Sequence, residues 1–191
     1  TQIVLGSAIA EAAFREKLGR SAVFFGALCG WLPDIDFFFH QPGTWEALQE
    51  HRGITHSLVF LTAMAPVLGG CVFLADRRLR GDRRAGEARD WILLCFWALI
   101  THPLLDLCTS YGTQLFYPFS DYRYATDAIS IIDFVYTIPL LLAAILSMRK
   151  KGSRELGRNI ARGALALSTA YLMFGHAFTS ICVSRAKANF T

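Results

Sequence analysis

Charged residues are scarce in this sequence. Asp, Glu, Lys and Arg make up 18% of the 191 residues, whereas hydrophobic residues make up 53%. An ordinary soluble domain carries about a quarter of charged residues. The low charge content therefore excludes an ordinary soluble protein, and the length favours one domain that covers residues 1–191.

Paired cysteine motifs are absent as well. The five cysteines are an odd number and form no CxxC spacing. Most of them stand in apolar runs, where we expect them to be small buried hydrophobic residues. The pattern is typical of neither a thiolate metal site nor a disulfide framework.

What the sequence does have is long stretches almost without charge. A helix needs about 20 apolar residues to cross the hydrocarbon core of a bilayer. The sequence predicts four transmembrane helices, at 57–75, 91–107, 131–148 and 163–183. Two shorter apolar runs joined by "REKLGR" predict a helical hairpin over 1–33 that enters the membrane partway or is buried against the bundle. The expected fold class is an all-α polytopic membrane bundle.

Basic residues are concentrated in two linkers. The linkers "DRRLRGDRRAGEAR" and "RKKGSRELGRNIAR" are rich in Arg and Lys, whereas the other two connections between the predicted spans are nearly free of them. The positive-inside rule places both basic linkers in the cytoplasm. Because topology explains these residues, we expect no nucleic-acid partner.

Histidine and aspartate occur in four motifs that this topology brings to the outer face of the membrane. The motifs are "LPDID" with Asp34 and Asp36, "HRGITHS" with His51 and His56, "THPLLD" with His102 and Asp106, and "SIIDFVYT" with Asp133. Ionisable groups at membrane depth are costly and are functional by default. The sequence therefore predicts one functional site that these motifs build together.

The ligand chemistry of this set suits a divalent metal. His102 and Asp106 are four residues apart and share one face of a helix. Nitrogen and oxygen ligands without thiolate suit zinc, manganese or iron, bound as one or two ions. The expected ligands are Asp34, Asp36, His51, His56, His102 and Asp106. Each motif alone has a simpler interpretation, such as a hydrogen-bonded His/Asp pair or, for Asp133, a helix N-cap.

Aromatic residues and two arginines surround these motifs. The segment "SYGTQLFYPFSDYRYATD" predicts either an interfacial aromatic belt or a lid over a site that is entered from the lipid headgroups. Arg52 and Arg123 are expected to pair with a phosphate, because a guanidinium binds phosphate in a bidentate way. Asp36 and Asp133 are the expected catalytic carboxylates. The roles of three further ionisable residues stay open: Glu11, Asp127 and His176.

The motifs also resemble a known family. "LPDID", "HRGITHS", "THPLLDLCTSYGTQLFYPFSD" and "IIDFVYTIPLL" are similar in order and spacing to the bacterial inner-membrane family of YdjM-like, LexA-regulated proteins. The likeness runs from "TQIVLGSAIAEA" to about Leu142. It implies a multi-pass inner-membrane protein with a metal-dependent hydrolase site at the Asp and His positions named above. Family members often have a histidine where this chain has Gln2.

The expected function is metal-dependent hydrolysis of a phosphoester in a lipid or lipid-linked substrate, at the periplasmic face of the membrane. The metal would lower the pKa of a bound water and polarise the phosphoryl oxygen. The alternatives are an amide or ester hydrolase and a non-enzymatic membrane protein with a structural or transported metal. A metal carrier is disfavoured, because the inner halves of the predicted spans lack polar groups.

Overall fold

A computed structural model describes residues 1–38, 52–80, 86–148 and 154–190. Within these ranges the regular secondary structure is helical, with one isolated bridge between Thr113 and Tyr124. The all-α class expected from the sequence is confirmed. His51, one of the expected metal ligands, lies outside the described residues.

The N-terminal segment forms the expected helical hairpin. It consists of α1 (Gln2–Ile9), a π-helix (Ala10–Phe14), α2 (Arg15–Leu18), α3 (Ser21–Trp31) and a 3₁₀-helix (Leu32–Phe38). The chain reverses between α2 and α3 at Gly19, whose φ of 76° lies in the region that favours glycine.

Glycines let the two arms of the hairpin pack at very short range. A Cβ added to Gly6 would lie 2.1 Å from the carbonyl oxygen of Gly26, and one added to Gly30 would lie 2.6 Å from that of Gln2. Small residues at such contacts are the usual means by which membrane helices approach closely. The contact fixes Gln2 and Gly30 side by side at one end of the hairpin.

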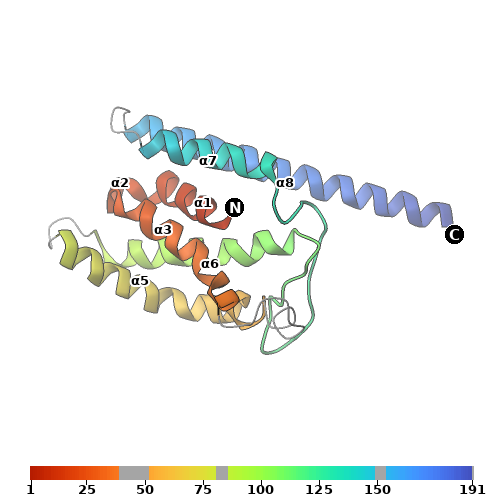
Figure 1. Ribbon diagram of the computed structural model, residues 1–191, viewed down its shortest axis with the longest axis horizontal. Coiled ribbons are helices and arrows are strands. Elements are labelled where there is room, and N and C mark those ends of the chain that lie inside the picture. The colour runs from red at the N-terminus through yellow and green to blue at the C-terminus, as the bar shows by residue number, and fades with distance from the viewer. Residues whose placement is uncertain (39–51, 81–85, 149–153, 191) are drawn as a thin grey trace.

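Four longer helices complete the molecule. They are α5 (Leu58–Arg80), α6 (Ala88–Leu107), α7 (Phe134–Met148) and α8 (Arg154–Phe190). Figure 1 shows the hairpin between two helix pairs, α5 with α6 on one side and α7 with α8 on the other. The far end of α8 extends beyond the rest of the bundle.

The helices agree with the predicted spans in number and position but differ in length. Among the described residues, α5, α6 and α8 are long and apolar enough to cross a membrane, while the apolar part of α7, Phe134–Leu146, is shorter. The helices α5 and α8 continue into the basic segments, where Arg, Ala and Leu favour helix. The helix α7 begins at Phe134, three residues after the start of the predicted span 131–148.

The packing makes α6 the central helix. Trp91, Leu94 and Leu99 of α6 are fully buried in an apolar cluster with α3 and α5. Leu105, near the other end of α6, belongs to a second cluster with α1, α7 and α8. Because α6 packs against α5 and the hairpin and Leu105 shares an apolar cluster with α7 and α8, the C-terminal turns of α6 lie where these elements meet.

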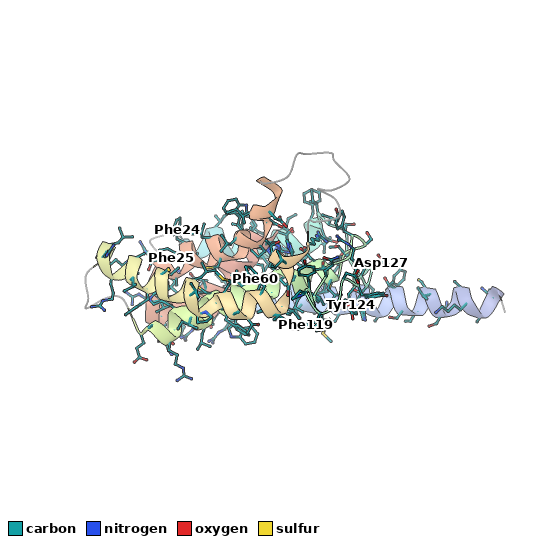
Figure 2. All side chains as sticks on the ribbon, turned by 90° about the horizontal axis from the view of Figure 1, so that it is seen from below. Phe24, Phe25, Phe60, Phe119, Tyr124 and Asp127 are labelled. Carbon is teal, nitrogen blue, oxygen red and sulfur yellow. The ribbon has the colours of Figure 1, made fainter. Side chains whose placement is uncertain are left out.

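The connection 108–133 covers this end of the bundle. Figure 2 shows Phe119, Tyr124 and Asp127 of the connection at the end of the bundle from which α8 extends. The amide of Gln114 donates to the carbonyl of Arg52, and the amide of Leu58 donates to that of Leu115. The connection therefore holds the segment that leads into α5 against the C-terminal end of α6.

Candidate metal centre

Four ionisable side chains meet at the C-terminal end of α6. Asp34 comes from the 3₁₀-helix after α3, His56 from a second 3₁₀-helix (Ile54–His56), and His102 and Asp106 from α6. One ligand atom from each lies within 4.8 Å of the others. We call these four residues the His/Asp cluster. The structure thus brings together residues from three of the four motifs.

The distances within the cluster fit one metal ion. His56 Nε2 lies 3.1 Å from His102 Nε2, and Asp106 Oδ2 lies 3.2 and 3.5 Å from these two nitrogens. Asp34 Oδ1 lies 3.2 Å from the His102 nitrogen and 3.5 Å from the His56 nitrogen. Tetrahedral zinc with bonds of about 2.0–2.1 Å places its ligand atoms about 3.3 Å apart. The five distances that involve at least one histidine nitrogen therefore match those of a tetrahedral site.

Hydrogen bonds on the far side of each ring set the tautomer. His102 Nδ1 lies 2.6 Å from the carbonyl oxygen of Gly30, which can only accept. His56 Nδ1 lies 3.0 Å from the hydroxyl of Thr55, and that hydroxyl donates to Asp36 Oδ2 at 2.7 Å. Each neutral ring therefore carries its proton on Nδ1. Both Nε2 atoms present lone pairs to the centre of the cluster.

Four acceptor atoms thus face one another. Asp106 Oδ2 is buried and accepts no hydrogen bond within the described part of the chain. Leaving a buried carboxylate oxygen without a donor is costly. A divalent cation held by the two Nε2 atoms and Asp106 Oδ2 would satisfy these buried acceptors, and imidazole with carboxylate is a ligand set that such cations accept.

The carboxyl of Asp34 is the most accessible member of the cluster. Its side chain is 37% exposed, whereas those of His56 and His102 are fully buried. Burial raises the pKa of this carboxyl, but hydrogen bonds and electrostatic attraction from the His102 and His56 rings in their protonated form outweigh burial and hold the pKa well below its usual range. Asp34 is therefore an anion at the accessible side of the cluster.

The second oxygen of Asp106 is held by two neighbours. Asp106 Oδ1 accepts a hydrogen bond from Gln2 Nε2 at 3.0 Å and lies 3.4 Å from Arg52 Nη2. Gln2 Nε2 also lies 3.2 Å from the carbonyl oxygen of His102. These contacts turn Oδ2 toward the centre of the cluster. Gln2 thus orients a ligand of the cluster.

Arg52 is a buried cation beside the cluster. It is 6% exposed, and its φ of 64° is uncommon for a residue with a side chain. Its Nη1 donates to the hydroxyl of Thr109 at 2.9 Å, and its guanidinium lies 4.8 Å from the ring centre of Tyr111. The Nε atom is buried and has no hydrogen-bond partner among the described residues.

A cavity of about 570 Å³ opens beside the cluster. Asp34, Arg52 and Asp106 line it on one side. The remaining wall is largely apolar and includes Trp31, Leu105, Ile129, Ile131, Ile132 and Phe134. Ile131, Ile132 and Phe134 are 55%, 71% and 70% exposed. In a membrane the apolar rim of the cavity would therefore contact lipid.

Two predicted site carboxylates lie outside the cluster. Asp36 is buried, and its Oδ2 is 3.9 Å from His56 Nδ1, on the side of the ring that faces away from the cluster. Asp133 lines the cavity, but its Oδ1 accepts the amide of Tyr136 at 2.9 Å and its Oδ2 accepts the hydroxyl of Tyr171 at 3.0 Å. The first of these bonds caps the N-terminus of α7.

Arg123 and His176 also lie apart from the cluster. Arg123 does not line the cavity; it donates to the carbonyl of Gly112 at 3.4 Å, and its guanidinium lies 5.9 Å from the ring centre of Tyr111. His176 is exposed on α8. Arg123 thus contacts the same tyrosine as Arg52 without facing the cavity.

The residues that orient the cluster carry no metal-ligand signal in the sequence. They are Gln2, Gly30, Thr55 and Thr109. The tripeptide Ile-Thr-His occurs at 54–56 and at 100–102, and this repeat is the one pattern that points to a threonine. Only the first threonine contacts its histidine, because Thr101 donates to the carbonyl of Trp97 within α6.

Comparison with known proteins identifies an inner membrane protein family and two bacterial relatives. Residues 1–182 match the family described as YdjM inner membrane protein. Inner membrane protein YbcI of Escherichia coli (strain K12) is 37% identical over 105 residues, which are 53% of this chain and 56% of the relative. Uncharacterized protein YfhP of Bacillus subtilis (strain 168) is 26% identical over 156 residues, which are 76% of this chain and 45% of the relative. The chain thus spans about half the length of these relatives, and no solved structure matches it.

Proposed function

This chain belongs to the YdjM inner membrane protein family, and from that membership and the His/Asp cluster we propose that it is a membrane-embedded, metal-dependent hydrolase. The proposed reaction is cleavage of a phosphoester in a lipid or lipid-linked substrate. One observation carries the proposal: a single cavity is lined by two residues of the cluster, by the buried Arg52 and by an apolar wall that ends in exposed residues.

The proposed ion is zinc, because two imidazoles and a carboxylate are ligands that zinc accepts. Three buried side chains would hold the ion: His56, His102 and Asp106. Asp34 is more exposed and lines the cavity. Catalytic zinc sites have three protein ligands and one exchangeable position, whereas structural sites are closed. We assign Asp34 to the exchangeable side, where it would accept the proton of the attacking water. The ion would supply a water of lowered pKa and polarise a phosphoryl oxygen.

Arg52 supports a phosphoester over an amide or a carboxylic ester. A buried guanidinium with an unpartnered Nε lines the cavity next to the cluster. Charge-assisted hydrogen bonds from arginine to phosphate are strong and directional. Arg52 Nη2 already pairs with Asp106 Oδ1 at 3.4 Å, so Nε is the donor that a phosphate oxygen would take, and a neutral amide or ester offers it only a weaker acceptor. The apolar wall would contact the hydrocarbon part of the substrate.

The other predicted catalytic residues receive indirect roles. Asp36 acts through Thr55 on His56, because its carboxylate accepts the hydroxyl that faces the His56 ring. Asp133 caps α7 and forms part of the cavity wall. Arg123 supports Tyr111, on which the guanidinium of Arg52 lies.

The distribution of charge supports a site at the periplasmic face. Figure 1 shows the C-terminal end of α5 and the N-terminal end of α8 at the end of the bundle opposite the connection 108–133. Basic residues gather at that opposite end, among them Arg77, Arg78 and Arg80 of α5 and Arg154, Arg158 and Arg162 of α8. By the positive-inside rule this basic end is cytoplasmic, so the cluster faces the other side.

The test is a hydrolysis assay on purified protein in lipid nanodiscs. The panel contains phospholipids, long-chain alkyl phosphates and matched carboxylic esters and amides, each with Zn²⁺ and with a chelator. We expect chelator-sensitive release of phosphate or of a phosphate ester. With Zn²⁺ in excess, so that every variant is loaded, Arg52→Ala should lower kcat/KM for phosphoesters by about 10²–10³, as the loss of one charge-stabilising group does.

The control variant is Arg77→Ala, which removes an arginine at the basic end that contacts Phe73. It should hydrolyse phosphoesters like the wild type. Hydrolysis of the esters or amides alone would contradict the phosphoester assignment. Hydrolysis that the chelator does not affect would contradict the metal.

A further inference from the structure

A second ionisable group is buried in the N-terminal hairpin, away from the His/Asp cluster. Glu11 is 2% exposed and lies in the π-helix Ala10–Phe14. One carboxylate oxygen pairs with Arg15, and the other, Oε2, is buried without a hydrogen-bond partner among the described residues. Buried ionisable groups at membrane depth and π-helical turns both recur at functional sites. The hydrolase proposed above makes no use of Glu11.

Glu11 lines a groove of about 440 Å³ between the two arms of the hairpin. Ser7, Glu11 and Arg15 line it from the first arm, and Arg20, Phe24 and Ala27 from the second. Spacings of three and four residues place each set on one helix face. Because the chain reverses at Gly19, the two arginines lie at the tip and Ser7 and Ala27 lie at the far end. The groove is therefore charged at its tip and apolar beyond Glu11.

Among the described residues, the mouth of the groove carries one cation that is not neutralised. Lys17 pairs with Asp90 at 2.8 Å, and Arg158 pairs with Glu16. Arg20 is exposed and forms no ion pair within the described residues. Phe24 is 65% exposed next to it, and Figure 2 labels this side chain on α3. An exposed arginine beside an exposed aromatic ring is the arrangement that suits a lipid headgroup above its hydrocarbon chain.

We propose that this groove binds a phospholipid whose headgroup carries a primary ammonium next to the phosphate, as in phosphatidylethanolamine. Arg20 takes the phosphate, because it is the unpaired cation at the mouth. The ammonium donates to Glu11 Oε2, which is the acceptor that has no donor. The hydrocarbon chain lies against Phe24 and Ala27. The lipid comes from the leaflet at the basic end of the bundle.

The carboxylate of Glu11 makes the groove selective among headgroups. A trimethylammonium, as in phosphatidylcholine, has no N–H and cannot donate a hydrogen bond to Oε2. A headgroup that is only anionic, as in phosphatidylglycerol, brings no cation to the carboxylate. The arginines alone would favour the anionic phosphatidylglycerol. The predicted preference for phosphatidylethanolamine over the other two lipids therefore depends on Glu11.

Native mass spectrometry directly tests which of these three lipids the protein prefers. The purified full chain is mixed in detergent with equal amounts of phosphatidylethanolamine, phosphatidylcholine and phosphatidylglycerol that have identical acyl chains. We expect wild type to retain phosphatidylethanolamine about ten-fold over phosphatidylcholine, the ratio that one charge-assisted hydrogen bond provides. Glu11→Gln should bring this ratio close to one. Lys17→Ala, which removes a cation outside the groove, should leave it unchanged.

Two further variants test the groove without touching Glu11. Arg20→Ala should lower retention of all three lipids, because each has the phosphate. Ala27→Trp should do the same by filling the apolar end, and it keeps the test decisive if Glu11→Gln fails to fold. Equal retention of phosphatidylethanolamine and phosphatidylcholine by wild type would overturn the proposal. So would a preference for phosphatidylglycerol, or retention that Ala27→Trp does not lower.

Discussion

Thr55→Val isolates the contact that orients His56. The hydroxyl of Thr55 lies 3.0 Å from His56 Nδ1 and 2.7 Å from Asp36 Oδ2, so it joins the ring to a buried carboxylate. Valine has the same shape and removes only the hydroxyl. The buried ring then loses the acceptor that faces its Nδ1–H, and with it the restraint that keeps Nε2 directed at the centre of the cluster.

The expected effect is a loss of metal affinity with the fold preserved. Removing a residue that orients a metal ligand typically weakens metal binding about 10–100-fold. That range corresponds to about 1.4–2.8 kcal/mol of binding free energy. We expect Thr55→Val to raise the Kd for Zn²⁺ within this range, measured by competition with a chromophoric chelator on purified protein.

Thr101→Val is the matched control. It makes the same change one residue before His102, but the hydroxyl of Thr101 donates to the carbonyl of Trp97 at 2.7 Å and does not contact the cluster. Its Kd for Zn²⁺ should equal that of the wild type. Equal affinities in Thr55→Val and wild type would refute the orienting role, and equal losses in both threonine variants would show that the effect is not specific to His56.

Three further changes test the cluster, the hairpin and the topology. His102→Ala removes a fully buried ligand and should abolish both equimolar metal binding and metal-dependent turnover in elemental analysis and assay; a variant that keeps its metal contradicts the ligand role. Gly26→Leu should destabilise the hairpin by at least about 1–3 kcal/mol in thermal unfolding, because a Cβ added there lies 2.6 Å from the carbonyl oxygen of Gly6. Gly70→Leu, with open space at its Cβ, should not destabilise it. A cysteine introduced by Gln114→Cys, with the native cysteines removed, should react with an impermeant maleimide from the periplasmic side; labelling only after permeabilisation contradicts the orientation.

The helices, and the end of the bundle at which the His and Asp motifs meet, follow from simple patterns in the sequence. Charge-free runs have the length of spans, and the i,i+4 spacing of His102 and Asp106 places them on one face of α6. The alternation of basic and non-basic connections then predicts which ends lie together. These arguments use helix geometry and the cost of moving charge across a membrane, and neither depends on side-chain detail.

Which carboxylate reaches the cluster, and which one contacts a neighbouring residue instead, could not be predicted in this way. Asp34 and Asp36 are two residues apart in one 3₁₀-helix, where such residues point in different directions. Only Asp34 reaches the cluster, and Asp36 instead reaches Thr55. Arg123 has the same chemistry as Arg52, but the pairing of Thr113 with Tyr124 places it outside the cavity wall. Such differences depend on tertiary contacts that no local pattern contains.

X-ray absorption at the zinc edge, on protein purified with Zn²⁺, tests the central claim most directly. The account predicts one ion per chain, bound only by nitrogen and oxygen at about 2.0–2.2 Å, with no sulfur near 2.3 Å. The signal of two imidazoles should fall in both His56→Ala and His102→Ala. Protein that stays free of metal would contradict the account, because the cluster would then be two histidine–aspartate ion pairs that share protons.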